Sequence, residues 1–320
     1  MSSQPDPVLR PNVEQANIAA LRDAYNKLQA LSGTDNRSWI YWAEYHGFNR
    51  YDCWHHARSG PSGTEFSYDL FLPWHRAYLV SWDHVTRDQN PDAILPWWDW
   101  TSDLSHQVGI PQAYSEDPVD GNRNSLASGP TPDMPDDPAR YTRRFPGDPG
   151  ELPSMTAQTP SNPAIETLLS LTSFVDFSNQ LQDVHDFIHG WSGGTDPNNP
   201  NAGGDMGNIG VAAFDPIFWA HHAMIDRLWY LWQLRQGANN VPANYMSQTL
   251  SPFPYTVQQV LDVHGLGYDY ASSSTGAGPA QTNGGGGASA EGASAGGAPG
   301  AGASGGGAPG AAESAGGTSR

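Results

Sequence analysis

The chain contains eleven histidines, and several of them fall where the sequence predicts helices. His185 and His189 are four residues apart, so on a helix both side chains project from one face and can bind the same metal ion. His222 lies in a strongly apolar stretch, where an imidazole without a polar partner is costly. His75 stands at the start of another predicted helix, and His46 and His55 or His56 lie upstream of it. These histidines are candidates for a metal site assembled from distant parts of the chain.

The ligand type limits the choice of metal. Buried histidines can simply be hydrogen-bonded parts of a core, but histidines from three separate elements in an aromatic core favour a metal site. Imidazole ligands suit copper, zinc, iron or nickel better than magnesium or calcium. Zinc hydrolases usually hold one ion with three protein ligands and need a nearby general base, and the sequence has no HExxH motif. Two sets of three histidines therefore favour a copper pair, with a zinc hydrolase as the alternative that metal analysis would test.

Four helices are predicted to position these histidines. Between the second and third helices, residues 102–161 are rich in proline, aspartate and glycine, which predicts long irregular loops. Helical bundles commonly place metal sites between facing helices, so the predicted fold is mainly α, a four-helix bundle around a dinuclear copper site. The predicted helices run from about Val13 to Leu31, from Pro73 through Asp88, from about Pro163 to Trp191 with a break near Thr172, and from Pro216, capped by Asp215, to Gly237.

Composition divides the chain into two parts. Residues 271–320 contain no aromatic, leucine, isoleucine, valine or methionine, and glycine, alanine and serine dominate there. Such a segment buries too little apolar surface to offset the entropy of ordering, so it is predicted to be a disordered tail. Residues 1–270 contain all twelve tryptophans and are predicted to form one catalytic domain.

Charge and cysteine content exclude several classes of partner. The formal net charge of −18 disfavours nucleic acid and anionic membranes as partners. The apolar stretches are too short and interrupted to span a bilayer. Cys53 is the single cysteine, which excludes an intrachain disulfide. The N-terminal segment lacks the basic and apolar regions of a secretory signal, so a cytoplasmic location is predicted, and the oligomeric state is left open.

Long motifs resemble the tyrosinase family of type-3 copper proteins, which includes catechol oxidases and molluscan hemocyanins. The resemblance covers about residues 10 to 270, in the order found in the family. It implies a helical domain with two copper ions, O2 as co-substrate and a small phenolic substrate. The motifs are FLPWHRAYL at Phe71–Leu79, LPWWDWT at Leu95–Thr101, HDFIHGWSGG at His185–Gly194, and AFDPIFWAHHAMIDRLWYLWQ at Ala213–Gln233.

The resemblance also implies a role for each histidine. In the paired histidines of the last motif the family uses the second as ligand, which leaves His221 outside the ligand set. Phe218 matches a family phenylalanine that packs against a ligand imidazole. The first copper would be held by His46, His55 and His75, and the second by His185, His189 and His222.

The second ligand of the first copper departs from the commonest pattern. Most relatives have a histidine nine residues before the histidine of the FLPWH motif, where this chain has Phe66. Cys53, Trp54 and His55 instead resemble the Cys-x-His of fungal relatives, in which the cysteine is joined to the histidine ring by a thioether. His55 is therefore the expected ligand, and His56 is the alternative.

The resemblance extends to the ends of the domain. Tyr268-Asp269-Tyr270 is similar to the Tyr-x-Tyr sequence that closes the catalytic domain in fungal relatives, and Arg10 resembles its N-terminal arginine partner. Asp226 and Arg227 are expected to connect helices rather than to perform chemistry.

The implied activity is that of a polyphenol oxidase, a tyrosinase or catechol oxidase that oxidises phenols to o-quinones. A monophenol titrates near pH 10 and must lose its proton, so a base or an ordered water is expected near the second copper. Gln182 stands where fungal relatives often have a water-ordering glutamate, and Asp186 where monophenolases commonly have asparagine. These departures leave monophenol hydroxylation open, whereas diphenol oxidation is expected. The alternatives are an o-aminophenol oxidase of secondary metabolism and a hemocyanin-like O2 carrier.

Overall fold

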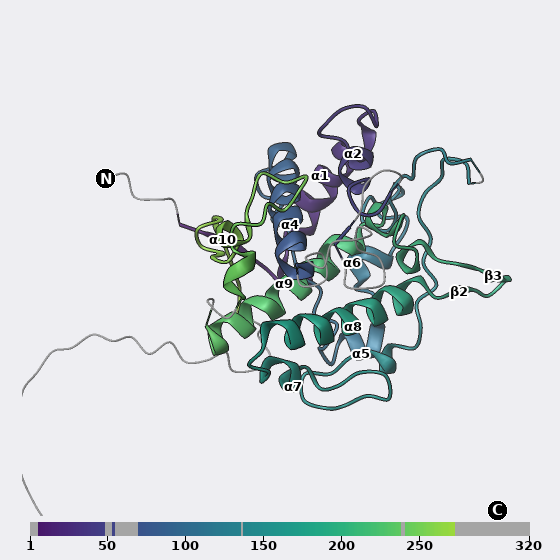
Figure 1. The fold of residues 1–320 in the computed structure, drawn as a ribbon. Coiled ribbons are helices and arrows are strands. Elements are labelled where there is room, and N and C mark those ends of the chain that lie inside the picture. Colours follow the sequence, from purple (N-terminus) through teal and green to yellow (C-terminus); the bar gives the residue numbers. More distant parts are fainter. Residues whose placement is uncertain (1–5, 49–52, 55–69, 136, 238–240, 273–320) are drawn as a thin grey trace, which may run out of the picture. The chain divides into compact units, whose positions relative to one another are not determined.

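The computed structural model describes residues 6–48, 53–54, 70–135, 137–237 and 241–272, and helices dominate this part of the chain (Figure 1). Helix α4 packs against α1 and α9 and also contacts α8, which makes it the central member of a mainly helical fold. The four long helices are α1 (Ile18–Ala30), α4 (Phe71–Gln89), α8 (Phe174–Gly193) and α9 (Ile217–Gln236).

Shorter elements complete the fold. The short helices are α2 (Trp39–Ala43), α5 (Ser105–Val108), α6 (Gln112–Ser115), α7 (Ile165–Leu169) and α10 (Val257–Val260). The 3-10 helices are η1 (Val13–Gln15), η2 (Pro149–Glu151), η3 (Asp205–Gly207), η4 (Ala212–Phe214) and η6 (Ala243–Tyr245). The strands are β1 (Val8–Arg10), β2 (Thr195–Asp196), β3 (Asn199–Gly203) and β4 (Tyr268–Tyr270), with β1 parallel to β4 and β2 antiparallel to β3.

The predicted start of the first helix is wrong, because a capping side chain begins α1 later. The side chain of Asn17 accepts a hydrogen bond from the Ala20 amide, so Val13 lies in the preceding 3-10 turn. The second helix begins two residues before the predicted Pro73, at Phe71. Proline tolerates this place because its missing amide would be unpaired in the first turn anyway.

The other two long helices follow the prediction more closely. The predicted break near Thr172 is confirmed, since α7 ends at Leu169 and Ser173 caps α8 by accepting a hydrogen bond from the Asp176 amide. Helix α9 begins at Ile217, whose amide donates to Oδ1 of Asp215. It ends at Gln236, and the next residue, Gly237, has a φ of +89° that glycine adopts without strain.

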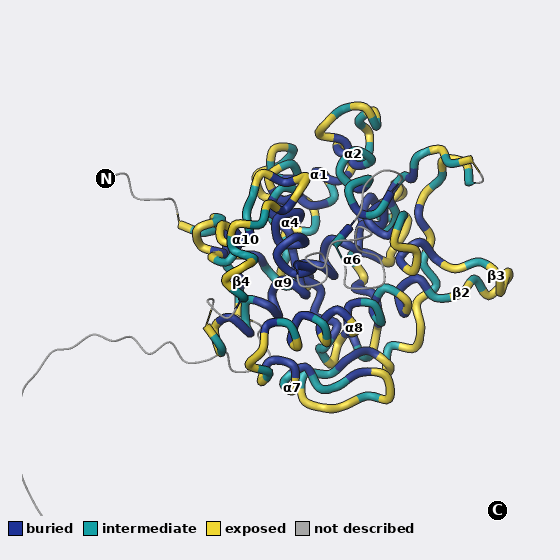
Figure 2. The backbone as a smooth tube through the Cα atoms, viewed as in Figure 1, coloured by how far each residue is buried: buried dark blue, intermediate teal, exposed yellow. Residues whose placement is uncertain are grey.

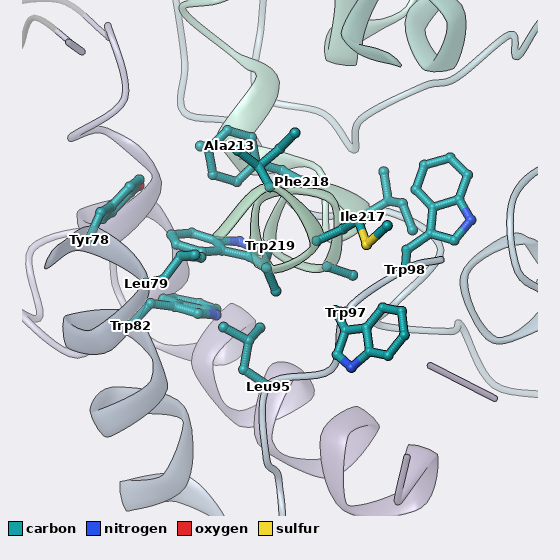
Figure 3. Packing of buried hydrophobic residues seen from close by; sticks show 14 of the residues in the cluster. Tyr78, Leu79, Trp82, Leu95, Trp97, Trp98, Ala213, Ile217, Phe218 and Trp219 are labelled. Carbon is teal, nitrogen blue, oxygen red and sulfur yellow. The ribbon is translucent and has the colours of Figure 1, made fainter. Parts of the chain in front are cut away.

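Tryptophans fill the interior where α4 meets α9. The rings of Trp82 and Trp219 stack with their centroids 4.0 Å apart (Figure 3). Trp39 meets the ring of Trp82 edge-on at 5.3 Å. Every residue of α9 from Ile217 to Trp229 is buried, so this part of the helix is enclosed on all sides (Figure 2).

A buried ion-pair cluster joins α4 and α9 to the two ends of the domain. The carboxylate of Asp226 on α9 lies 2.5 Å from Nε of Arg76 on α4 and 3.5 Å from Nη1 of Arg10 on β1. The hydroxyls of Tyr268 and Tyr270 donate to the same carboxylate at 2.7 and 2.5 Å. The guanidinium of Arg10 also lies 3.7 Å from the centre of the Tyr268 ring. The predicted partnership of Arg10 with the Tyr-x-Tyr sequence is confirmed.

The long connection between α4 and α8 is irregular, as predicted, with only short helical turns within residues 102–161. Arg227 lies over the Trp97 ring at 4.0 Å and so connects α9 to the preceding LPWWDWT segment. Among the described helices, none combines the length and apolar character needed to cross a membrane. The predicted tail lies outside the described residues from residue 273 onward.

Candidate metal centre

Helices α8 and α9 bring three imidazoles together. His185 and His189 project from one face of α8, as their spacing predicted, and His222 projects toward them from α9. The Nε2 atom of His222 lies 3.2 Å from Nε2 of His185 and 3.2 Å from Nε2 of His189. One ion can therefore reach all three nitrogens.

A second group of histidines adjoins the first. His75 comes from the first turn of α4, and its ring stacks on that of His222 with the centroids 4.6 Å apart. His46 follows α2, and its ring centroid lies 5.4 Å from that of His75. One nitrogen from each of His46, His75 and His222 lies within 4.8 Å of the others. Because His222 belongs to both groups, the two groups are adjacent.

In four of these rings, the Nδ1 atom makes a hydrogen bond to a neighbouring oxygen atom. A carbonyl oxygen only accepts, so a ring bonded to one must carry its proton on Nδ1 and leave the lone pair on Nε2. That tautomer is the one in which Nε2 can bind a metal, and such second partners hold metal-binding imidazoles in orientation. The partners of Nδ1 are the Phe71 carbonyl for His75 at 2.8 Å, the Ile209 carbonyl for His46 at 3.1 Å, the Met206 carbonyl for His189 at 2.8 Å, and Oδ1 of Asp186 for His185 at 2.9 Å.

These tautomers leave an electrostatic conflict that a cation would resolve. If His185 and His189 both turn an Nε2 lone pair toward His222, the single Nε2 proton that His222 can carry satisfies only one of them. Nitrogens bound tetrahedrally to an ion at about 2.0 Å lie about 3.3 Å apart, close to the 3.2 Å observed. The group therefore fits a metal ion of the type that imidazoles bind.

Burial keeps these imidazoles neutral. It lowers the pKa of His75 to about 3 and that of His189 to about 4, against the opposing effect of their backbone hydrogen bonds. Burial also lowers the pKa of His46 and of His222 well below the usual value, with further lowering from neighbouring histidines. Neutral imidazole is the form that binds a metal, so these four rings need no deprotonation near neutral pH.

Phe218 packs between the two groups. It lies one turn before His222 on α9, with its ring centroid 4.0 Å from that of His222 and 4.6 Å from that of His46. The expected contact between this phenylalanine and an imidazole is present. It restricts the rotation of one ring from each group.

The structure shows a contact of Asp186 that the sequence did not suggest. The sequence suggested that it accepts a proton from the substrate or pairs with an arginine. Its carboxylate accepts the Nδ1 proton of His185, the residue before it, while the side chain stays 37% exposed, and both suggested roles stay predictions. Gln182 lies one turn earlier on α8 and is buried. Its expected role in orienting a water molecule stays a prediction.

Two of the predicted residues lie outside the described part of the chain. His55 and its alternative His56 belong to residues 55–69, so the third ligand of the first copper stays a prediction. Cys53 is described and is buried. A Cβ atom on Gly47 would lie 3.3 Å from its sulfur, which places Cys53 beside the segment that follows His46. The thioether between Cys53 and His55 also stays a prediction.

His221 lies closer to the first group than the sequence suggested. Its ring stacks on that of His185 at 5.2 Å, and one of its nitrogens lies within 4.8 Å of nitrogens of His185, His189 and His222. Burial lowers its pKa well below the usual value. The nearby backbone of His185 partly opposes this lowering of the pKa. Among the described residues, neither ring nitrogen of His221 has a well-aligned hydrogen-bond partner. Helix periodicity alone could not predict that the side chains of both His221 and His222 lie near α8, because adjacent residues on a helix usually face different neighbours.

A separate cavity of about 480 Å³ lies along the loop between α5 and η2. Arg144 and Trp191 are among its lining residues, and no histidine lines it. The chemistry is therefore assigned to the imidazole groups, where the donors converge, rather than to this cavity.

Comparison with known proteins agrees with this geometry. The model of the common central domain of tyrosinase matches residues 36–235. Units G and H of the hemocyanin of Sepia officinalis are 27% identical over 250 residues, which is 74% of this chain and 40% of that protein. The tyrosinase of Streptomyces glaucescens is 27% identical over 188 residues, which is 54% of this chain and 66% of that protein. The chain thus spans less than half of the Sepia protein and about two thirds of the Streptomyces one.

Solved structures share the same arrangement of helices. The tyrosinase of Burkholderia thailandensis superposes with a TM-score of 0.67 at 22% identity, covering 85% of this chain and 76% of that one. A functional unit of octopus hemocyanin superposes with a TM-score of 0.61 at 25% identity, covering 83% of this chain and 68% of that one. These likenesses support the mainly helical fold around the imidazoles.

Proposed function

Because the chain belongs to the tyrosinase family of type-3 copper proteins, we propose that it is a copper-dependent oxidase that converts phenols and o-diphenols to o-quinones with O2. The observation that carries the proposal is the convergence of three imidazole nitrogens, with Nε2 of His222 3.2 Å from Nε2 of His185 and of His189, next to a second histidine group. In this proposal the first copper is held by His46, His55 and His75, and the second by His185, His189 and His222.

The protein contributes orientation and a dry environment to this reaction. When bound, a copper pair supplies the electron transfer between phenol and O2 that side chains cannot perform. The carbonyls of Phe71, Met206 and Ile209 hold three of the rings in the metal-binding tautomer. In the overall reaction two o-diphenols lose four electrons and four protons, and one O2 becomes two molecules of water.

The residues beside the group of His185, His189 and His222 favour diphenols over monophenols. A monophenol must lose a proton that titrates near pH 10, so it needs a base. Gln182 can orient a water molecule but cannot accept its proton, and the carboxylate of Asp186 is already engaged with His185. An o-diphenol is more easily oxidised and needs less help from a base, so diphenolase activity is the main activity proposed.

The proposed approach of the phenol is past His189. This imidazole is only half-buried, whereas His185 and His222 are buried. Gly190 follows it, and a Cβ atom there would meet nothing within 4 Å. A small planar ring can reach the group of His185, His189 and His222 from this side without displacing a side chain of the described residues.

A hemocyanin-like O2 carrier is the second candidate, because hemocyanin units match the chain over most of its length. Both functions use the same imidazole groups, so the metal site alone does not separate them. Oxidation of an added phenol does, because a carrier releases O2 unchanged.

The test is a parallel assay of the copper-loaded full chain on catechol, tyrosine and 3-amino-4-hydroxybenzoate. O2 uptake and product absorbance are recorded together, and the metal-free chain serves as the control. The proposal predicts rapid oxidation of catechol and slow or absent oxidation of tyrosine. Fastest turnover of the aminophenol would instead indicate an o-aminophenol oxidase. Reversible O2 uptake with none of the substrates oxidised would overturn the proposal in favour of a carrier.

A further inference from the structure

One short segment orients a histidine in each of the two groups. The Met206 carbonyl accepts the Nδ1 proton of His189, and the Ile209 carbonyl accepts that of His46. His189 belongs to the group around α8, whereas His46 belongs to the group around α4. The two orienting carbonyls are therefore three positions apart along one stretch of backbone.

The other two oriented rings do not depend on this segment. His75 donates to the carbonyl of Phe71, which is on its own helix α4. His185 donates to Asp186, which is on its own helix α8. A displacement of the segment would thus disturb one ring in each group and leave one ring in each group unchanged.

Close backbone contacts hold one side of the segment against the end of α8. A Cβ atom on Gly193 would lie 2.4 Å from the Gly207 amide nitrogen, and one on Gly204 would lie 2.4 Å from the Gly193 carbonyl oxygen. Both positions need glycine because real Cβ atoms do not approach backbone so closely. The contact leaves little freedom for the segment to move toward α8.

An ion pair holds the other side. Asp205 directly precedes Met206, and its carboxylate accepts two hydrogen bonds from Arg140, at 2.7 and 2.8 Å. The same carboxylate accepts the Arg143 amide at 2.6 Å, and the Asp205 amide donates to the Arg143 carbonyl at 2.8 Å. The Asp205 side chain is only 4% exposed. A bidentate pair in this setting fixes direction as well as distance.

We infer that the Arg140–Asp205 ion pair positions His189 and His46 together through the Met206–Ile209 segment, so that the two copper ions are bound and lost as a pair. Arg140 and Asp205 act as positioning residues and touch neither metal nor substrate. The inference rests on the proposed copper function, and it adds that binding at the two sites is coupled through this backbone.

The test compares copper retention in the full chain and two variants. Asp205→Asn keeps the side-chain size but removes the charge that holds Arg140. Asp137→Asn is the matched control, because Asp137 also pairs with Arg140, at 2.7 Å, but makes no hydrogen bond or ion pair to the Met206–Ile209 segment among the described residues. Copper per chain is measured across a series of concentrations of a Cu(I) chelator. Loss of a partner that orients a metal-binding histidine typically lowers metal affinity by about 10- to 100-fold.

The expected result is that Asp205→Asn loses both ions at a chelator concentration roughly 10- to 100-fold lower than the wild type, in one step, while Asp137→Asn behaves like the wild type. Loss of a single ion from Asp205→Asn would overturn the inference. Unchanged retention, or equal loss from the control variant, would also overturn it.

A second measurement works on the metal-free chain. The ring nitrogens of His46 and His189 should each report one tautomer in the wild type by ¹⁵N NMR, and a mixture in Asp205→Asn. The rings of His75 and His185 should not change. Arg140→Lys provides a milder variant if Asp205→Asn fails to fold. Unchanged tautomers in a folded variant would refute the positioning role, whereas a wild-type chain that binds no copper would refute the proposed function alone.

Discussion

Asp226→Asn tests the connection between the helices that carry one histidine of each group. Asp226 lies four residues after His222 on α9, and its partner Arg76 directly follows His75 on α4. The rings of His75 and His222 stack with centroids 4.6 Å apart, so the ion pair lies next to the place where the groups meet. Replacing the carboxylate by an amide keeps the shape and removes the charge.

The expected loss follows from burial. The side chains of Arg76 and Asp226 are 0% and 3% exposed, and that of Arg10 is 1% exposed. Removing one partner of a buried pair leaves an uncompensated charge and typically costs about 3–5 kcal/mol. In a domain of this size each kcal/mol lowers the unfolding temperature by about 2–4 °C, so a fall of roughly 6–20 °C is expected.

Urea unfolding followed by tryptophan fluorescence measures the loss. Glu166→Gln is the control, because the Glu166–Arg235 pair has similar geometry, at 2.6 Å, but its side chains are 43% and 40% exposed. An exposed pair contributes about 0–1 kcal/mol, so this variant should unfold almost like the wild type.

The effect of Asp226→Asn should also depend on pH. Burial disfavours the charged form of Asp226, but Arg76 and Arg10 outweigh it and hold the pKa of the carboxyl below its usual value. A lowered pKa means that the carboxylate stabilises the fold above its unfolded pKa, and that this stabilisation is lost as the pH falls through the folded pKa. The difference between wild type and variant should therefore shrink below about pH 4. A difference of less than about 1 kcal/mol at pH 7 would refute the reasoning.

Three further substitutions test residues beside the imidazoles. Asp186→Asn should weaken binding of the second copper by roughly 10-fold or more, because the amide orients His185 less firmly; a chelator titration checks this, and unchanged affinity would contradict it. Gln182→Glu should raise the ratio of tyrosine to catechol turnover by supplying a base for an ordered water, and an unchanged ratio would exclude that role. Phe218→Ala should lower the free energy of unfolding by about 3–5 kcal/mol and reduce copper occupancy, since it removes a ring packed on His222 and His46. Full copper occupancy in that variant would show that the packing does not position the rings.

The sequence predicted the helices and histidines whose signals are local. The four-residue spacing of His185 and His189 requires only that the segment be helical, and it correctly placed both on one face of α8. The break near Thr172 was predicted correctly, and in the structure Ser173 caps the helix that follows it. The start of α1 was misplaced because the apolar periodicity extends past the cap at Asn17 into a 3-10 turn.

What the sequence did not predict depends on main-chain atoms and tertiary contacts. The carbonyls of Phe71, Met206 and Ile209 orient three rings, but every residue has a carbonyl, so no residue type marks these positions. The position of His221 within reach of the first group depends on the rotation of α9 against α8. The contact of Asp186 with His185 depends on a side-chain rotamer, which spacing does not determine.

The central claim is that two copper ions are held by these imidazoles, and anomalous diffraction at the copper edge from crystals of the copper-loaded chain tests it most directly. The account predicts two strong peaks, one among the Nε2 atoms of His185, His189 and His222 and the other beside His46 and His75. A single peak, or peaks away from these rings, would contradict it.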